Sequence, residues 1–254
     1  MAEAQINGIQ VRYDAAGDGP AVLLSHGYSA TGRMWAPQVE ALKDRYRIIT
    51  WDMRGHGETE SPDDPARYSE ALTLADRVGL LEFLGEDRAV VGGLSLGGFM
   101  SLAFHLAHPE MVRALVLCDT GPGYRSPEAR AGWNRAAEKR ALDLEARGMD
   151  ALGSSSEVRA TARYHLSARG LAHAARGMLA QADARIIDHL PEIRVPSLVI
   201  VGERDEPFIG ASEYMAAKIP GARLEVIPGA GHAANLDNPD HFNGVLRGFL
   251  DSLP

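Results

Sequence analysis

Short apolar runs spaced along the chain limit its fold more strongly than any other feature of the sequence. Each run has the length of a strand and lacks polar alternation, which is typical of strands buried on both faces of a parallel sheet. The runs are AVLLS (21–25), YRIITW (46–51), RAVVG (88–92), ALVLCD (114–119), SLVIVG (197–202) and ARLEVI (222–227). The sequence therefore predicts a core built around one sheet.

Helical patterns separate these runs. Residues 69–85 begin at Ser69, a residue type that caps helices, and end at Gly85, which can adopt the left-handed conformation at a helix end. Residues 96–110 place apolar side chains on one helical stripe, and residues 239–253 form another amphipathic pattern. Strands that alternate with helices predict an α/β fold, with a mostly parallel sheet covered by helices on both faces.

The N-terminal residues carry a different signal. Asn7-Gly8 lies between the alternating runs AQI and IQVRYD. Both residues of this pair tolerate positive φ, so they favour a tight turn between antiparallel strands. The sequence predicts a β-hairpin here.

One segment interrupts the alternation. Residues 121–191 contain no strand-like run and are rich in Ala, Arg, Glu and Leu. They predict several short helices inserted between one strand and the next. The residues expected to separate these helices are Gly132, Gly148, 153–156, Gly170 and Gly177.

The most informative motif follows the run RAVVG. Gly93-Leu94-Ser95-Leu96-Gly97 fits the pattern G-x-S-x-G, and a helical stripe begins directly after it. In a strand–turn–helix unit of this kind, the serine lies at a sharp turn and its hydroxyl is exposed. A serine hydroxyl is a weak nucleophile and needs a base, a group that orients the base, and donors for the developing oxyanion. Ser95 is thus a candidate nucleophile.

Further motifs accompany this serine in a characteristic order. They are LLSHGYSAT, WDMRGHGETESP, GLSLGG, VIVGERDEPF and VIPGAGHAANLDNPDHF. Together they resemble the α/β-hydrolase fold superfamily over nearly the whole chain, although Thr59 stands where serine is commoner. The resemblance is nearest to 3-oxoadipate enol-lactonase-like and carboxylesterase members.

The resemblance implies an architecture. It is an eight-stranded, mostly parallel sheet flanked by helices, with a helical lid inserted after the sixth strand. Residues 1–120 and 192–254 would then form the core domain, and residues 121–191 the lid.

The resemblance also implies roles for individual residues. Ser95 would be the nucleophile, His232 the general base and Asp205 the carboxylate that orients it, in the chain order that the fold uses. Three other acidic residues, Glu203, Glu206 and Asp119, remain alternatives for the carboxylate. Asp119 ends the strand after the nucleophile helix, where some members of the superfamily place it.

The oxyanion hole would be built from backbone. Its donors would be the N–H groups of Leu96 and Tyr28, so the side chains there shape the pocket instead. Tyr28, Trp133 and Phe208 are expected to contact substrate, although packing alone would also explain such residues. An arginine of the lid that holds a substrate carboxylate is a further option; the candidates are Arg125, Arg130, Arg135, Arg163 and Arg169.

The expected activity is hydrolysis of a small or medium carboxylic ester or lactone through an acyl-enzyme, without a cofactor. Carbon–carbon bond hydrolases and perhydrolases use the same triad and remain alternatives, as does a slow-turnover ligand receptor of the same fold. Haloalkane dehalogenases and epoxide hydrolases are disfavoured because they need aspartate in place of Ser95.

Composition argues against several other classes of protein and kinds of site. A net charge of −8 provides no basic surface for nucleic acid or an anionic membrane. The single cysteine, Cys118, cannot form an intrachain disulfide. His105 and His108 have no third metal ligand near them in the sequence, so a metal site is not expected there. No leader or membrane span is visible, so a cytoplasmic location is expected. The oligomeric state cannot be read from the sequence.

Overall fold

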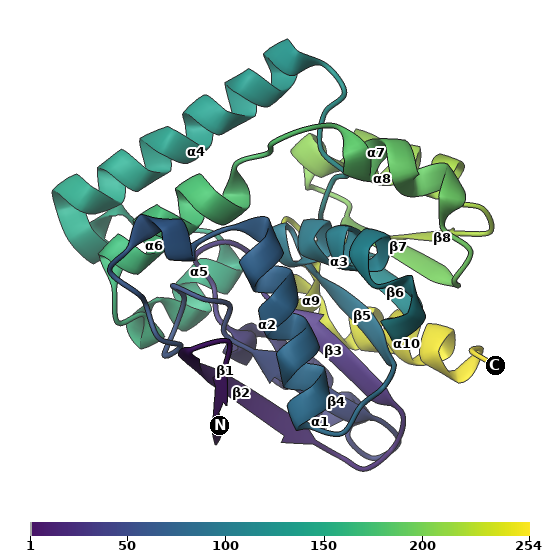
Figure 1. Cartoon of the computed structure of the whole chain (residues 1–254). Helices are drawn as coiled ribbons and strands as arrows, with labels where there is room; N and C mark the ends of the chain where they lie inside the picture. The colour runs from purple at the N-terminus through teal and green to yellow at the C-terminus, as the bar shows by residue number, and fades with distance from the viewer. Residues whose placement is uncertain (1) are drawn as a thin grey trace.

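The predicted apolar runs lie in one eight-stranded sheet in the computed structural model, which describes residues 2–254 (Figure 1). The strands are β1 (Ala2–Ile6), β2 (Ile9–Ala16), β3 (Ala21–Ser25), β4 (Arg47–Trp51), β5 (Ala89–Leu94), β6 (Val112–Cys118), β7 (Ser197–Gly202) and β8 (Arg223–Ile227). Their order in the sheet is β1-β2-β4-β3-β5-β6-β7-β8. β2 pairs antiparallel with β1 and β4, and all other pairs are parallel. The prediction of a mostly parallel sheet is confirmed.

The predicted hairpin joins β1 and β2. Ile6 pairs with Ile9, and the two residues between them have positive φ, 47° for Asn7 and 73° for Gly8. These angles are those that a two-residue hairpin turn requires.

Helices cover both faces of this sheet (Figure 1). They are α1 (Ala36–Leu42), α2 (Glu70–Phe83), α3 (Leu96–Ala107), α8 (Glu206–Lys218), α9 (Ala234–Asp237) and α10 (Pro239–Asp251). Along β3, Leu23 packs into the core under α2, α3 and α8, whereas Val22 and Leu24 pack into the core under α1 and α10. Alternate residues of a strand point to opposite faces, so an uninterrupted apolar run serves both cores. The expected cap Ser69 accepts a hydrogen bond from the Leu72 N–H at 3.1 Å.

The segment between β6 and β7 is helical, as expected. It contains α4 (Pro127–Arg147), α5 (Ser156–Thr161), α6 (Ala168–Ala174), a π-helical segment Ala175–Leu179, and α7 (Arg185–His189). Figure 1 shows α4 lying beyond the end of the sheet, with its axis across the molecule. Among the helices of residues 2–254, none is both long and apolar enough to cross a membrane.

The expectation that Gly132 separates short helices is wrong, because α4 runs through it for 21 residues. A glycine inside a helix costs only about 1 kcal/mol, and the Ala, Arg and Glu residues that make up most of the rest of α4 favour a helix. The Ser126 hydroxyl accepts a hydrogen bond from the Ala129 N–H at 3.2 Å at one end. Gly148, with φ of 61°, ends the helix as expected.

Gly170 and Gly177 also do not separate helices. Gly170 lies inside α6 and Gly177 inside the π-helical segment. A Cβ atom on Gly170 would overlap the side chain of Ser61, and one on Gly177 would overlap the carbonyl oxygen of Tyr68. These glycines therefore allow the insert to pack closely on the core.

Candidate active site

Ser95 lies at the sharp turn between β5 and α3. Its φ of 53° and ψ of −113° are unfavourable for a residue with a side chain. The turn is fixed by neighbouring backbone: the Ser95 N–H donates to the Cys118 carbonyl at 2.9 Å, and the Ser95 carbonyl accepts from the Thr120 hydroxyl at 2.7 Å. A Cβ on Gly93 or Gly97 would overlap the Ser25 carbonyl oxygen, so only glycine allows this approach.

Asp205 and His232 are brought together from two different loops. Asp205 directly precedes α8, and His232 lies between β8 and α9. Asp205 Oδ2 and His232 Nδ1 are 2.8 Å apart, and the carboxylate is buried. Burial alone would lower the pKa of His232, but the hydrogen bond and charge of Asp205, with the charges of Glu157 and Asp119, raise it above its usual 6.5. The pair can therefore stabilise an imidazolium.

The other acidic residues that the sequence left open have different partners. Asp119 accepts hydrogen bonds from the N–H of Gly202 at 2.7 Å and of Ala234 at 3.3 Å. Burial raises the pKa of Asp119 well above its usual value. Glu203 accepts from the Gly229 N–H at 2.7 Å, and Glu206 is exposed. Asp119 thus connects the end of β7 to the loop that carries the histidine.

The loop after β3 carries Tyr28, and a buried histidine holds this loop. The Met53 N–H donates to His26 Nε2 at 2.9 Å, so His26 Nδ1 carries the proton and donates to the Gly27 carbonyl at 2.7 Å. Burial lowers the pKa of His26 to about 3, so this imidazole stays neutral. Leu96 is the first residue of α3, where the helix leaves amide groups without an intrahelical partner.

Tyr28 also contacts the insert. Its hydroxyl donates to the Leu171 carbonyl at 2.8 Å, and the half-buried ring packs edge-on against His56. Burial raises the pKa of Tyr28, so the phenol remains a donor.

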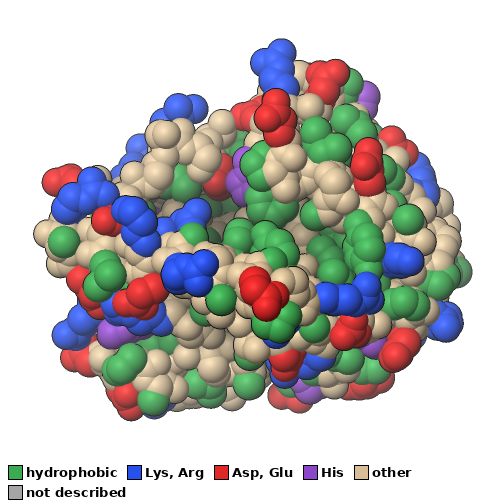
Figure 2. Space-filling model, turned by 90° about the horizontal axis from the view of Figure 1, so that it is seen from above, with side chains coloured by type: hydrophobic (Ala, Val, Ile, Leu, Met, Phe, Trp, Pro, Cys, Tyr) green, Lys and Arg blue, Asp and Glu red, His purple; other side chains and the backbone are tan. Residues whose placement is uncertain are grey.

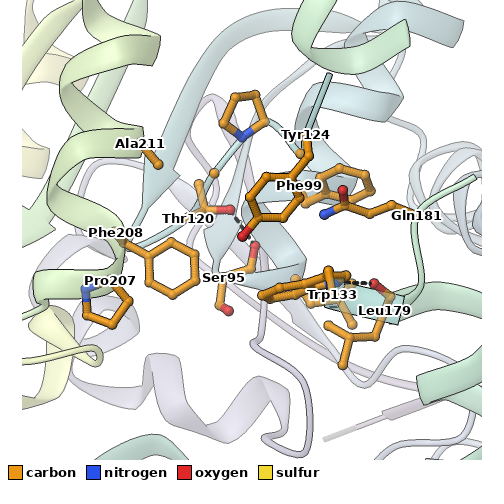
Figure 3. Close-up of a pocket in the computed structure, with 14 residues that line it drawn as sticks. Ser95, Phe99, Thr120, Tyr124, Trp133, Leu179, Gln181, Pro207, Phe208 and Ala211 are labelled. Carbon is orange, nitrogen blue, oxygen red and sulfur yellow. Dashed lines mark hydrogen bonds between the residues drawn. The ribbon is translucent and has the colours of Figure 1, made fainter. Parts of the chain in front are cut away.

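Two cavities meet at Ser95. The first has a volume of about 270 Å³ and an apolar lining; Figure 3 shows Ser95 with Phe99, Tyr124, Trp133 and Phe208 around it. The second has a volume of about 550 Å³ and also contains Asp205 and His232. We call the first the acyl cavity, after the role proposed for it below, and the second the polar cavity, because Arg140, Glu157, Asp205 and His232 are among the residues that line it. From above, Figure 2 shows a hollow lined with hydrophobic side chains on this face of the molecule.

The three residues expected to contact substrate all reach this region. Trp133 and Phe208 line both cavities, whereas Tyr28 lines only the polar cavity. The Phe208 ring lies 4.9 Å from the His232 ring between centroids.

The cavities also contain residues that the sequence did not single out. Among them are Phe99 and Gln181 in the acyl cavity, Arg140 and Glu157 in the polar cavity, and Tyr124 in both. None of the five arginines expected as candidates lines either cavity within residues 2–254; Arg125, for example, pairs with Asp188 at 2.5 Å. Arg140 and Glu157 follow no strand and fit no motif, so nothing in the sequence indicated them.

His105 and His108 do not converge on a common ligand. His105 Nδ1 lies 3.1 Å from His189 Nε2, and His108 lies near Glu110. Cys118 is buried at the end of β6, and burial raises the pKa of its thiol. Within residues 2–254, no cluster of three or more His, Cys, Asp or Glu side chains has the arrangement of a metal site.

The chain is similar to known proteins over most of its length. A family model described as the alpha/beta hydrolase family matches residues 22–243. A Bacillus subtilis (strain 168) protein named as a 2-succinyl-6-hydroxy-2,4-cyclohexadiene-1-carboxylate synthase is 31% identical, with 96% of each chain covered. The 3-oxoadipate enol-lactonase 1 of Acinetobacter baylyi is 27% identical, covering 96% of this chain and 94% of that one. A thermophilic esterase from Thermogutta terrifontis superposes with a TM-score of 0.82 at 30% identity, covering 98% and 97%.

Proposed function

The chain belongs to the alpha/beta hydrolase family, and from this premise we propose that it is a cofactor-free serine hydrolase that cleaves a carboxylic ester or lactone through an acyl-enzyme. One observation carries the proposal: Ser95, in a strained turn, shares the polar cavity with the hydrogen-bonded pair of Asp205 and His232. Similarity to proteins named as an enol-lactonase and an esterase supports an ester or lactone as the substrate.

The proposed reaction has two halves. Ser95 Oγ attacks the carbonyl carbon while His232 Nε2 takes the hydroxyl proton, and His232 Nδ1–H remains bonded to Asp205. The backbone N–H groups of Leu96 and Tyr28 are the donors for the oxyanion. His232 then gives its proton to the leaving oxygen, and the ester bond breaks. In the second half, water loses a proton to His232 and attacks the acyl-enzyme, which frees the acid and restores Ser95.

The lining of the two cavities suggests where each part of the substrate binds. His232 must reach the leaving oxygen, and His232 lines only the polar cavity. The leaving group is therefore assigned to the polar cavity and the acyl group to the acyl cavity.

We propose that residues 121–191 act as a lid over residues 1–120 and 192–254. Trp133 and Leu179 of this segment line the acyl cavity together with Ser95 and Phe208 of the core. Closure of such a segment would exclude water while the acyl-enzyme forms.

Reaction with a serine-directed fluorophosphonate and release of p-nitrophenol from short esters test this function together. We expect covalent labelling at Ser95 alone, and sustained release of p-nitrophenol after the first turnover. A reactive Ser95 with a burst and no further turnover would favour a ligand receptor of this fold instead. Labelling that persists in Ser95→Ala would contradict the assignment of the nucleophile.

The pH profile depends on His232. The imidazole must be neutral to accept a proton, and its pKa is raised above 6.5. We expect kcat/KM to fall as the pH decreases through a pKa above 6.5. Glu157→Gln removes a negative charge that favours the imidazolium, so the acid limb should move to lower pH.

A matched control for this profile is Glu82→Gln, which removes an exposed carboxylate of α2. Profiles of kcat/KM against pH for the three proteins check the prediction. An acid limb at the same pH in wild type and Glu157→Gln would contradict it.

A further inference from the structure

One polar side chain stands out in the acyl cavity. Gln181 is only 9% exposed, and its carboxamide is directed toward the rings of Phe99 and Tyr124 (Figure 3). Its Oε1 atom is buried and has no hydrogen-bond partner within residues 2–254. Oε1 lies against Gly123 and is closed to a ligand in the cavity, so the end of the amide left for a ligand is Nε2, which makes no hydrogen bond within residues 2–254.

The backbone under this side chain is held firmly. Asn134 Nδ2 donates to the Gln181 carbonyl at 2.9 Å, and the Gln181 N–H donates to Asn134 Oδ1 at 2.8 Å. The neighbouring Trp133 Nε1–H donates to the Leu179 carbonyl at 2.8 Å. Two adjacent residues of α4 therefore fix the segment 179–181. A side chain on a fixed segment can select for one substrate geometry.

The opposite wall leaves room for the carboxamide. Gly123 has φ of 87°, and a Cβ atom there would lie 3.0 Å from Gln181 Oε1. The glycine thus permits a close approach that a side chain would crowd.

The lack of charged residues in the lining limits the kinds of chemical group that Gln181 can bind there. The residues that line the acyl cavity include no Lys, Arg, Asp or Glu. A carboxylate buried there would have no counter-charge, which is costly. The accessible Nε2 of the carboxamide is a hydrogen-bond donor, and a neutral hydroxyl can accept from it without bringing a charge into the cavity.

We propose that Gln181 is a specificity-determining residue that hydrogen-bonds a hydroxyl group on the acyl chain of the substrate. The inference rests on the proposed esterase or lactonase function and specifies its substrate class: esters of hydroxy acids rather than of plain alkanoic or dicarboxylic acids. The oxygen of this hydroxyl accepts a hydrogen bond from Gln181 Nε2. In an otherwise apolar pocket, a small number of polar groups commonly fixes the orientation of the ligand in this way.

Pairs of methyl esters that exchange a hydroxyl for a methyl group test the proposal. Suitable pairs are 3-hydroxybutyrate with 3-methylbutyrate, and 5-hydroxyhexanoate with 5-methylhexanoate, which place the hydroxyl at two distances from the scissile carbonyl. In the wild type, we expect kcat/KM for the hydroxyl member of one pair to exceed that of its partner by about tenfold, as one hydrogen bond allows. Gln181→Met preserves length and removes both hydrogen-bonding groups, so the ratio should fall to about one or below.

Two further variants complete the test. Gln5→Met makes the same exchange at an exposed position of β1 and should keep the wild-type ratio. If Gln181→Met folds poorly, Gln181→Leu removes the same hydrogen-bonding groups in a second variant. A purely structural role would lower the melting temperature and slow both members of a pair equally.

The outcomes separate the two claims. Hydrolysis that depends on Ser95, with the same ratio in wild type and Gln181→Met, overturns the role of Gln181 alone. A preference for the half-ester of a dicarboxylic acid over both hydroxy esters also overturns it. No hydrolysis of any of these esters that depends on Ser95 overturns the proposed function, and the role of Gln181 with it.

Discussion

Ser95→Ala is expected to lower kcat for ester hydrolysis by about 10⁶-fold, because the proposed acyl-enzyme cannot form without the hydroxyl. Binding and the backbone N–H groups of Leu96 and Tyr28 would still leave a residual rate above that in water. KM should change little, since the cavities keep their shape. Steady-state kinetics with p-nitrophenyl esters measure the loss.

Ser95→Gly separates the chemical role of this residue from its conformational cost. Both variants lack the hydroxyl, but only glycine relieves the strain at φ of 53°. Glycine also gives the unfolded chain more conformational freedom, which offsets part of this gain. We therefore expect the free energy of unfolding of Ser95→Gly to exceed that of Ser95→Ala by about 1 kcal/mol. The melting temperature should then be about 2–4 °C higher. Equal melting temperatures, or activity retained in either variant, would contradict this account.

The core and the turn at Ser95 could be predicted because their signals are local. A buried parallel strand needs a continuous apolar run, and the runs at 21–25 and 197–202 coincide with β3 and β7. The glycines beside Ser95 are needed for close backbone approach, which the motif itself indicates. The strand that leads to the turn is longer than expected, since β5 continues through Gly92 and Gly93 to Leu94.

The insert was less predictable because packing decides its structure. Gly132 indicates a break by propensity, yet the surrounding residues carry α4 through it. Gln181 and Arg140 reach the cavities because of how α4 lies over the core, and no short motif encodes that arrangement. The sequence therefore did not indicate Gln181 or Arg140, although it did indicate Tyr28, Trp133 and Phe208.

Asp205→Asn is expected to lower kcat by about 10⁴-fold, the second-largest effect among these variants. Asparagine cannot carry the charge that stabilises the imidazolium of His232, and it can favour the wrong imidazole tautomer. The sequence left Asp119 as an alternative because both acids follow buried strands. In the structure, His232 Nδ1 lies 2.8 Å from Asp205, while the Asp119 carboxylate accepts from two backbone N–H groups.

Asp119→Asn therefore has a different expected outcome, and the two variants together decide between the acids. Asparagine offers one side-chain oxygen where the N–H groups of Gly202 and Ala234 need two acceptors, so one donor loses its partner. The cost is about 1–3 kcal/mol of stability, seen as a lower melting temperature, with a smaller loss of kcat than in Asp205→Asn. If kcat instead collapses in Asp119→Asn and survives in Asp205→Asn, then Asp119 is the acid that acts on His232. The hydrogen bond between Asp205 and His232 would then not be the one used in catalysis.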